Sequence, residues 1–529
     1  MKKKKLKALV VASLIVCSFG FIACGESSDK AIQKDGGKET VEENDNSLVY
    51  GSGDYTTINP AINDSSEIDS LIFNGLVARD GDANIIPCLA ESWEHDEATN
   101  MYTFKLRSDI KWHDGKPFTA NDVKFTFDII QNEDNMSARA SGFEAIESVE
   151  VVSDTELVVK LSEPNVAILD ALTVGIVPKH LLDGKDPKTA EFNTNPVGTG
   201  PYKFKSWDKG QNIIMVKNDE YFEGAPSIEE IVFKIVTDDK ALAMQIKSGE
   251  IDLAQVTPKD MAAIEKEEGL TVHKMKTADY RGIMYDFNRP LFKENKGIVN
   301  ALNYAIDRQA ILDSVLLGYG EVAYSPLQMG DYNNPDMEKF EYNPAKAKEK
   351  IEKLGFKLGD DGIYAKGDEK LAFELVCSEG DQVRIDMATI CAQFFEEIGI
   401  DAKVAVKASV DWGNEDTYVV GWGSPFDPDD HTYRVFGTDK DANYNAYSNA
   451  KVDELLAKAR QTTDEAERLK LYQEFQIEIG KDMPYTFIAY LEAMFVANDN
   501  LKGIDEDTIL GHHGAGIFFN VDEWSLEEK

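Results

Sequence analysis

Two short runs of this sequence contain residue types that could bind a metal ion or a positively charged group. His512 and His513 are adjacent, and neighbouring imidazoles can bind a metal. The flanking Gly511 and Gly514 suit a turn equally well, so both interpretations stay open. The second run is Asp427-Pro428-Asp429-Asp430, whose carboxylates could face a ligand ammonium or a metal, or could form a tight polar turn.

Recognisable catalytic motifs are absent from the sequence. It has no Gly-x-Ser-x-Gly elbow, no Gly-Lys-Ser/Thr phosphate loop, no His-Glu-x-x-His and no Cys-x-x-Cys. A hydrolase of this size would be expected to show a nucleophile or a metal set. We therefore predict that the protein is not an enzyme and that it has no catalytic residues, no metal site and no cofactor.

Cys24 is the one residue near the N-terminus whose surroundings indicate covalent chemistry. Five lysines within residues 2–7 precede an apolar run over 8–23, which is long enough for a signal peptide but short for a membrane span. The run ends in Phe21-Ile22-Ala23-Cys24-Gly25, which resembles a bacterial lipobox. We predict a lipoprotein signal peptide over 1–24, a diacylglycerol on Cys24 and a lipid anchor on the extracytoplasmic face of the cell membrane. An ordinary secretory signal or an uncleaved anchor is the alternative.

The remaining composition is that of a large soluble body. The formal net charge is −39 over 529 residues, which argues against nucleic acid or an anionic membrane surface as a partner. Residues 25–47 contain almost nothing that could pack, so we predict a disordered tether. Cys88, Cys377 and Cys391 are too few and too widely spaced for a disulfide framework or a zinc pattern, so we expect buried thiols or at most one pair.

Strand and helix patterns alternate over residues 48–529, which predicts a mixed α/β fold. Apolar alternation predicts strands at 48–51, 102–106 and 156–161. Helical spacing predicts a helix that starts at Asn121-Asp122 and others at 298–317, 345–354, 382–398, 452–460 and 464–481. No repeat or low-complexity linker interrupts the region, so we expect two or three lobes between which the chain crosses.

Four sequence blocks, taken together, resemble the pattern of a known family. Residues 89–123 contain LAESW, YTFKLR and IKWHDGKPFTANDV, which fit a strand, an Asp-Gly turn and a capped helix. The other blocks follow in the family's order: PVGTGPY at 196–202, SGEIDLA at 248–254 and NALNYAIDR at 300–308. The chain is therefore identified as a member of the extracellular solute-binding proteins, family 5, of peptide and nickel ABC importers.

The resemblance implies a two-lobed, periplasmic-binding-protein-like α/β fold (type II, cluster C) with an extra subdomain in the first lobe. On that basis we place lobe I at 48–85, 191–287 and 488–529, its extra subdomain at 86–190 and lobe II at 288–487. The resemblance also implies a monomeric substrate-binding protein without catalysis. It would close its lobes on a ligand and present the closed form to ABC permease subunits.

The ligand expected from the resemblance depends on the loop after Trp422. In peptide-binding relatives an aspartate three residues later pairs with the peptide's α-amino group, but Pro425 stands there, and Asp427 or Asp429 would substitute only in a shifted loop. Residues 423–428 also resemble the Gly-Ala-Pro-Tyr-Asp-Pro loop of nickel-binding relatives, with Phe426 in place of the tyrosine. We predict short peptides as the ligand, with nickel or a metal–chelator complex as the alternative. An enzyme or signalling receptor on the same fold is the least favoured reading.

The predicted ligand site combines this loop with residues near the two crossings. We expect Trp422 to form a wall of the cleft. Some dipeptide-binding relatives place an arginine for the peptide carboxylate at the position of Arg384, and a guanidinium suits that contact. It could instead be a surface arginine, and aromatic residues at the crossings could line the cleft or brace the hinge. The full predicted set is Tyr280, Arg384, Trp422, Gly423, Ser424, Phe426, Asp427 and Tyr490.

Overall fold

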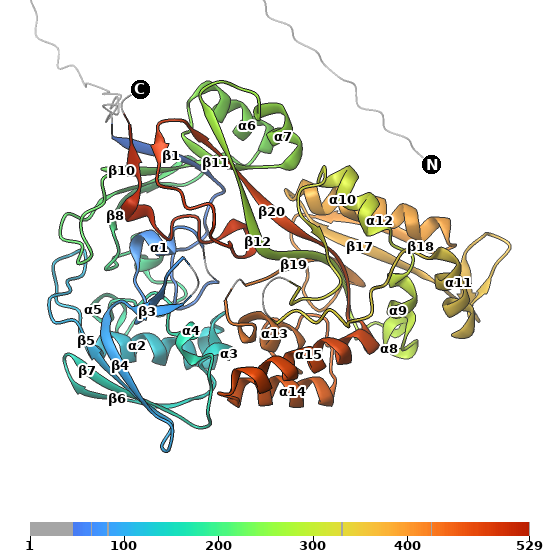
Figure 1. Ribbon diagram of the computed structural model, residues 1–529, viewed down its shortest axis with the longest axis horizontal. Helices are drawn as coiled ribbons and strands as arrows, with labels where there is room; N and C mark the ends of the chain where they lie inside the picture. The colour runs from blue at the N-terminus through green and yellow to red at the C-terminus, as the bar shows by residue number, and fades with distance from the viewer. Residues whose placement is uncertain (1–45, 65, 82–83, 329–331, 425, 528–529) are drawn as a thin grey trace, which may run out of the picture. The chain divides into compact units, whose positions relative to one another are not determined.

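Two long strands organise the fold. β12 (Leu270–Tyr285) and β20 (Tyr485–Asn498) pair antiparallel along most of their length and run through the middle of Figure 1. The computed structural model describes residues 46–64, 66–81, 84–328, 332–424 and 426–527. Within them, one sheet contains both strands in the order β18 (Asp401–Lys407), β17 (Ala372–Ser378), β19 (Thr417–Trp422), β12, β20, β11 (Leu253–Val256), β1 (Ser47–Ser52), β10 (Glu230–Ile235), β9 (Asn212–Lys217) and β8 (Tyr202–Asp208), with β13 (Glu321–Val322) paired to β20.

Separate hydrophobic cores divide the chain along these two strands. Met275 on β12 and Ala493 on β20 belong to a core that otherwise contains residues from 48–253 and 493–524. Tyr280 and Tyr490, a few residues further along, belong to a core built from residues 280–490. A smaller third core underlies α6 (Asp239–Ser248) and α7 (Pro258–Ile264). The fold therefore has two lobes, lobe I with the first and third cores and lobe II with the second, and β12 and β20 join them.

Lobe I contains the expected extra subdomain. Its sheet has the order β4 (Ala90–Asp96), β5 (Met101–Leu106), β7 (Glu156–Leu161) and β6 (Ile146–Ser153). Inward-facing residues of β5 and β7 alternate with outward-facing ones, as predicted from the sequence. The helix predicted from Asn121 is α2 (Ala120–Gln131), which begins at a capping box between Thr119 and Asp122.

Shorter elements complete lobe I. They are α1 (Asp69–Ile72), β2 (Val77–Arg79), β3 (Ile85–Pro87), α3 (Ala140–Phe143), α4 (Ile168–Ala171), α5 (Lys179–Leu182), β21 (Leu501–Lys502) and β22 (Ser525–Leu526). The first strand of the chain, predicted at 48–51, is β1, and it begins one residue inside the predicted tether.

Lobe II confirms most of the predicted helices and corrects one. The single helix predicted at 298–317 is two helices, α9 (Ile298–Asn303) and α10 (Arg308–Val315). The break occurs because the Asp307 side chain accepts a hydrogen bond from the Ala310 N–H and so starts a new helix. The other elements are α8 (Pro290–Glu294), α11 (Pro344–Lys353), β14 (Lys357–Leu358), β15 (Tyr364–Lys366), β16 (Glu369–Lys370), α12 (Gln382–Glu397), α13 (Asp429–Phe436), α14 (Ala450–Gln461) and α15 (Glu465–Asp482).

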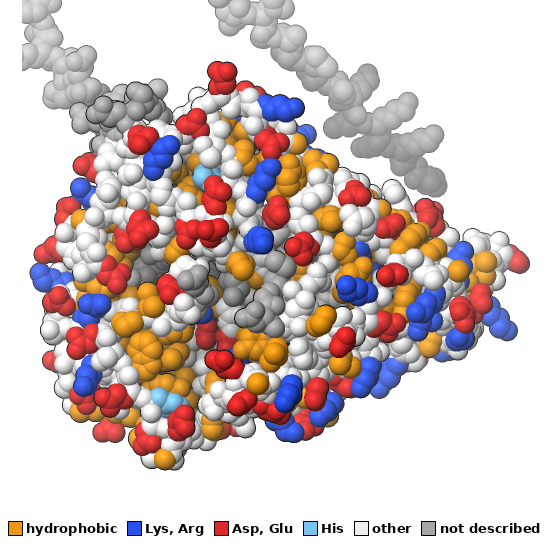
Figure 2. Space-filling model, in the orientation of Figure 1, with side chains coloured by type: hydrophobic (Ala, Val, Ile, Leu, Met, Phe, Trp, Pro, Cys, Tyr) orange, Lys and Arg blue, Asp and Glu red, His pale blue; other side chains and the backbone are white. Residues whose placement is uncertain are grey.

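The surface and the cysteines agree with the composition. Figure 2 shows acidic side chains spread over the visible face, with lysines and arginines between them. Cys88, Cys377 and Cys391 are buried and unpaired, as expected of structural thiols. No helix in the described ranges is long and apolar enough to span a membrane. The predicted signal peptide, Cys24 and nearly all of the predicted tether lie outside the described residues.

Candidate functional site

β12 is irregular at the place where the two cores meet. Its pairing with β20 shifts between Lys276 and Tyr280, so residues 277–279 stand opposite the single residue Leu491. Thr277 stabilises this bulge, since its hydroxyl donates to the Leu491 carbonyl (2.7 Å) and accepts from the Asp279 N–H (3.0 Å). A bulge changes the direction of the side chains that it contains. Here it places Asp279 against the segment that contains His512 and His513.

The Asp279 carboxylate is buried and accepts hydrogen bonds from three groups. Arg281 donates from its guanidinium, His512 Nδ1 lies 2.9 Å from Asp279 Oδ1, and the His513 N–H donates to Oδ2 at 3.0 Å. Burial alone would raise the pKa of Asp279, but the charge of Arg281 and then His512 hold that pKa well below its ordinary value. The carboxylate is therefore ionised and fixes the adjacent histidines in place.

His513 stands between two guanidinium groups. Its Nδ1 is 3.5 Å from Arg281 Nη2, and its Nε2 is 3.2 Å from Arg384 Nη2. Burial, and after it the neighbouring His512 and Arg281, lower the pKa of His513 well below 6.5, so the ring is neutral at pH 7. A neutral imidazole has one acceptor nitrogen and one N–H, so it cannot accept from both guanidiniums. One N–H of the ring must therefore face a donor of an arginine.

His513 also reaches solvent. The residue is exposed although burial by surrounding atoms lowers its pKa, which is the combination expected of a side chain in a recess. Its φ of 57° lies in the left-handed region that is uncommon for residues other than glycine. We call Asp279, Arg281, Arg384, His512 and His513 the crossing cluster.

Trp422 forms an aromatic wall next to the crossing cluster. It is the last residue of β19, opposite Tyr280 on β12. Its ring stacks on His512 with centroids 6.3 Å apart and on Tyr444 with centroids 6.0 Å apart. The residue is half-buried. A chain of contacts through His512 and His513 thus connects Trp422 with Arg384, and the role of either residue in ligand binding stays a prediction.

Glycines on both sides of Trp422 let β19 approach the bulge. A Cβ at Gly421 would overlap the Arg281 guanidinium, and a Cβ at Gly423 would overlap the Ala278 carbonyl oxygen. Any larger residue at either position would push the tryptophan strand away from β12. The two glycines therefore fix the spacing between the aromatic wall and the charged groups.

The structure places Asp427 and Phe426 in other contacts. Both oxygens of Asp427 pair with Arg468 of the same lobe, each at 2.6 Å from a guanidinium nitrogen. The exposed Phe426 ring lies 3.9 Å from the Arg79 guanidinium carbon of lobe I, so it forms a cation–π contact across the lobes. A direct role of either residue in ligand binding stays a prediction.

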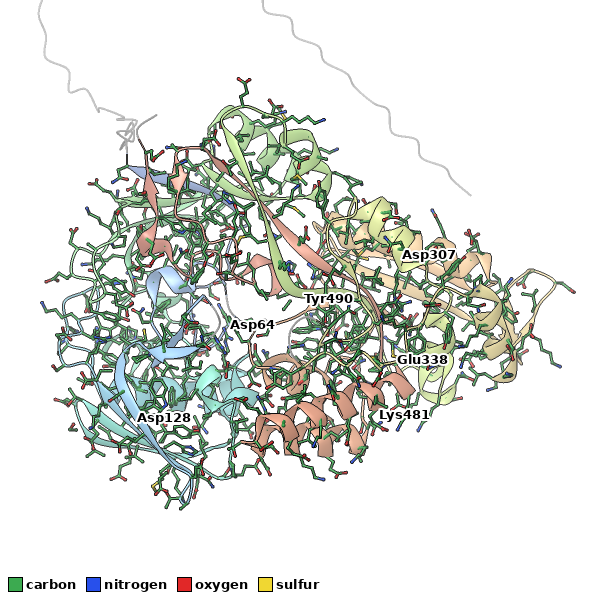
Figure 3. All side chains as sticks on the ribbon, viewed as in Figure 1. Asp64, Asp128, Asp307, Glu338, Lys481 and Tyr490 are labelled. Carbon is green, nitrogen blue, oxygen red and sulfur yellow. The ribbon has the colours of Figure 1, made fainter. Side chains whose placement is uncertain are left out.

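The two predicted tyrosines lie in the core of lobe II. Tyr280 and Tyr490 are 0% and 2% exposed, and Tyr490 is labelled in Figure 3. The Tyr490 hydroxyl donates to the Ser325 carbonyl (2.8 Å) and accepts from the Gln328 N–H (3.1 Å). These contacts are those of a residue that braces the crossing. Contact of either tyrosine with a ligand is not tested by this arrangement.

Asp430 is a carboxylate that the sequence did not distinguish from its neighbours. Asp429 is buried against Arg460, whereas Asp430 is exposed. Burial would raise the pKa of Asp430, but Arg434, and after it a hydrogen bond from Ser424, hold it below its ordinary value. Only side-chain direction separates the two aspartates, and helix α13 sets that direction. The adjacent carboxylates therefore have different environments.

Comparisons with known proteins agree with this architecture. The family model of the bacterial extracellular solute-binding proteins, family 5, matches residues 84–470. The oligopeptide-binding protein AppA of Bacillus subtilis is 32% identical over 99% of this chain and 100% of its own length.

Two solved structures have the same fold. NikZ from Campylobacter jejuni, in complex with Ni(L-His), has a TM-score of 0.87 at 35% identity and covers 91% of this chain and 99% of its own. AppA from Bacillus subtilis, in complex with a nonapeptide, has a TM-score of 0.84 at 32% identity with the same coverage. The chain therefore belongs to family 5 of the bacterial extracellular solute-binding proteins and is a substrate-binding protein of the kind that serves ABC importers.

Proposed function

We propose that this protein captures short peptides outside the cytoplasmic membrane and delivers them to an ABC permease by closing its lobes. The peptide's carboxylate binds at the crossing cluster, between Arg384 and His513. Trp422 covers the adjacent apolar part of the ligand. The protein returns the ligand chemically unaltered and acts as a monomer.

The observation that supports this proposal most directly is the position of His513 between two guanidiniums. With a neutral ring, the N–H of His513 faces an N–H of one of the two arginines. A ligand carboxylate placed there would accept hydrogen bonds from both of these donors. Burial, and after it the charge of Arg281, lower the pKa of Arg384 to about 10, so Arg384 stays protonated at pH 7. Arg281 is paired with Asp279 and Arg384 with Asp381 (2.9 Å), so an anionic ligand group would share guanidinium donors with these carboxylates.

Binding of carboxyl and amide forms of one peptide tests the proposal. Peptides retained from a mixture of synthetic short peptides are titrated calorimetrically as free acids and as C-terminal amides. We expect the amide to bind at least about tenfold more weakly, since a charged hydrogen bond contributes about 1.5–3 kcal/mol. Arg384→Gln should remove most of that difference, whereas Lys403→Gln, on the exposed side of β18, should keep it. Equal affinity of acid and amide would contradict the carboxylate contact.

A metal complex is the second candidate. The paired His512 and His513 rings and the likeness to NikZ favour it. Within the described residues no group of three His, Cys, Asp or Glu could hold a metal ion, so the metal would have to arrive with its own ligands. Ni²⁺ with excess L-histidine, titrated in parallel with the peptides, separates the two candidates. Tight binding of this complex with no retained peptide would replace the peptide proposal.

We also propose that Cys24 carries the lipid that anchors the protein on the extracytoplasmic face. The lipobox-like sequence supports this. Cys24→Ala should leave the membrane fraction or remain unprocessed. Unchanged processing together with unchanged membrane retention would contradict the anchor.

A further inference from the structure

The two lobes meet at a second place, away from β12 and β20. There, α3, α4 and their flanking loops in lobe I contact α13, α14 and the 437–449 loop in lobe II (Figure 1). We call this set the rim contacts. The rim contacts include three backbone-directed bonds and several side-chain pairs. The bonds to backbone are Arg434 to the Ala138 carbonyl (2.7 Å), Arg460 to the Ser141 carbonyl (3.2 Å) and the Val166 N–H to the Arg460 carbonyl (2.8 Å). The side-chain pairs are Arg434 with Asp64 (3.7 Å), Lys440 and Tyr433 with Glu144, and Gln461 with Glu163 (2.7 Å).

Glu144 of lobe I contacts two side chains of lobe II, Lys440 and Tyr433. Lys440 Nζ lies 2.8 Å and 3.0 Å from its two carboxylate oxygens, and the Tyr433 hydroxyl donates to it at 3.1 Å. The Tyr433 ring lies between two cations of its own lobe, 4.5 Å from Lys440 Nζ and 3.6 Å from the Arg460 guanidinium carbon. Burial would lower the pKa of Lys440, but Glu144 and Tyr433 raise it above its ordinary value. Lobe II therefore presents a preformed cationic surface to Glu144.

Arg460 joins both lobes through its side chain and its backbone. Its guanidinium binds Asp429 within lobe II and donates to the Ser141 carbonyl of lobe I. Its carbonyl accepts from the Val166 N–H of lobe I. This backbone hydrogen bond forms only when the turn before α4 lies against the C-terminal end of α14. The Val166 amide is thus a direct reporter of contact at the rim.

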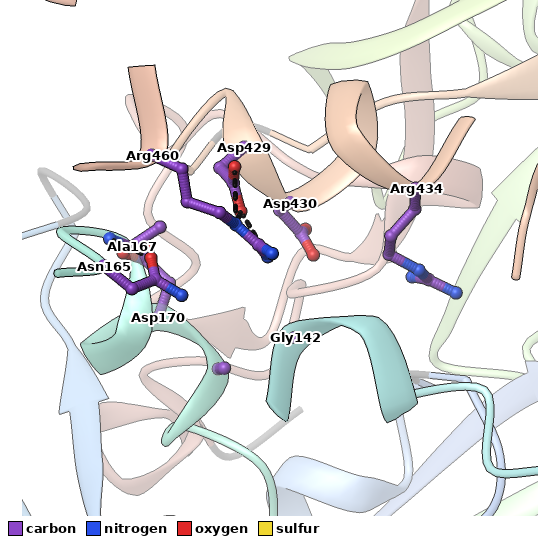
Figure 4. Close-up of a pocket in the computed structure, with 9 residues that line it drawn as sticks. Gly142, Asn165, Ala167, Asp170, Asp429, Asp430, Arg434 and Arg460 are labelled. Carbon is purple, nitrogen blue, oxygen red and sulfur yellow. Dashed lines mark hydrogen bonds and ion pairs between the residues drawn. The ribbon is translucent and has the colours of Figure 1, made fainter. Parts of the chain in front are cut away.

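The rim closes around a small polar cavity of about 30 Å³, shown in Figure 4. Residues of both lobes line it, among them Asn165 and Asp170 from lobe I and Asp430 and Arg434 from lobe II. A cavity of this size holds no more than about two water molecules. Residues of both lobes therefore lie against one another around this cavity.

We propose that the rim contacts are a latch that stabilises the closed form independently of ligand chemistry. None of its pairs belongs to the crossing cluster or to the Trp422 wall. Opening the lobes would break them together, while β12 and β20 stay paired. The latch therefore adds the same closing free energy for every ligand, and it lets the empty protein sample the closed form.

Hydrogen exchange at the Val166 amide tests the latch without any ligand. Glu144→Gln and Lys440→Gln in the full-length protein should each raise the Val166 exchange rate by about two- to fivefold, because one partly exposed ion pair is lost. The Leu172 amide, bonded within lobe I to Ile168, should not change. The matched control is Glu454→Gln, whose ion pairs to Lys451 and Lys458 stay within α14.

The exchanged pair Glu144→Lys with Lys440→Glu should restore slow exchange at Val166. A wild-type Val166 amide that exchanges as fast as an open loop would overturn the latch, because the closed contact would not be populated. Unchanged Val166 exchange in both single variants would also overturn it. If a peptide or the Ni²⁺–histidine complex binds the wild type, both variants should lower the affinity for either ligand by the same factor. Unequal factors would assign these residues to one ligand's site.

Discussion

The crossing cluster and the rim contacts both join lobe I to lobe II, but they do so with different physics. Asp279 and Arg281 are 2% and 3% exposed, and their charges are committed to one another inside the protein. At the rim, the Glu144 and Lys440 side chains are 43% and 21% exposed, and water can replace each partner. Buried pairs are costly to break and exposed pairs are not. The Asp279–Arg281 pair is therefore suited to stay formed, and the Glu144–Lys440 pair is suited to form and release.

Asp279→Asn should show the largest effect. It leaves Arg281 buried without its counter-charge, which we expect to lower the free energy of unfolding by about 3–5 kcal/mol. The rim counterpart is Asp64→Asn. Asp64 projects from lobe I toward lobe II in Figure 3 and contacts Arg434 and Arg139 at 3.7 Å and 3.8 Å. Asp64→Asn should lower the free energy of unfolding by no more than about 1 kcal/mol. Denaturation by guanidinium chloride at pH 7 measures both variants. Similar losses of unfolding free energy in Asp279→Asn and Asp64→Asn would contradict the difference between the two regions.

Asp427→Asn should have the next largest effect, on stability and not on binding. Its bidentate pair with Arg468 positions the loop between the Trp422 wall and α13. Weakening that pair should cost about 2–3 kcal/mol in the free energy of unfolding. Under conditions where the variant is fully folded, its affinity for ligand should change less than about threefold. A large affinity loss without destabilisation would instead support the ligand contact expected from the sequence.

Trp422→Ala should weaken binding of any retained peptide by about one to two decades. An aromatic wall contributes on the order of 1–3 kcal/mol through the apolar area that it covers. Trp412→Ala is the control, because Trp412 contacts the same Tyr444 ring, with centroids 4.8 Å apart, and is 43% exposed. Calorimetric titration should show less than about a threefold change there. Wild-type affinity in a folded Trp422→Ala protein would remove this wall from the site.

The smallest effect concerns pH. His513 has a pKa lowered in the folded state, so the unfolded chain takes up a proton near pH 6.5 that the folded ring does not. Stability from this group is present above pH 6.5 and decreases as the pH falls toward 5. His513→Gln should therefore make the melting temperature fall less steeply between pH 7 and pH 5. His113 and His431 also have lowered pKa values and remain as a common background in both proteins. If the melting temperatures of the wild type and of His513→Gln fell equally between pH 7 and pH 5, the lowered pKa of His513 would be contradicted.

Local pattern predicted β1, β5 and β7 and the helices α2, α11, α12, α14 and α15, because amphipathic spacing and capping are read within a few residues. The prediction failed at 298–317, where helical spacing continues through a break that Asp307 creates by capping a new helix. Family resemblance supplied the two-lobed arrangement. Periodicity alone would not have done so, since the two cores divide in the middle of β12 and β20.

Two of the predicted site residues belong to one chain of contacts in the structure, and their role in binding stays a prediction. Trp422 and Arg384 were chosen from the sequence, and His512 and His513 connect them in the structure. Asp279 was not chosen, because its contact with His513 joins residues 234 positions apart through a register shift in β12. Likewise, no spacing rule separates Asp430 from Asp429. Side-chain direction at a bulge or on a helix is decided by packing with distant segments.

The three buried cysteines have a consequence for the life of the protein outside the membrane. Burial raises the pKa of each thiol, Cys88, Cys377 and Cys391, to about 12. At pH 7 only about one in 100,000 of each is then a thiolate, which is the form that oxidants and disulfides attack. In the folded protein these three thiols are thus shielded from oxidants. They become reactive only in molecules that have unfolded, so labelling of these three residues would count those molecules directly.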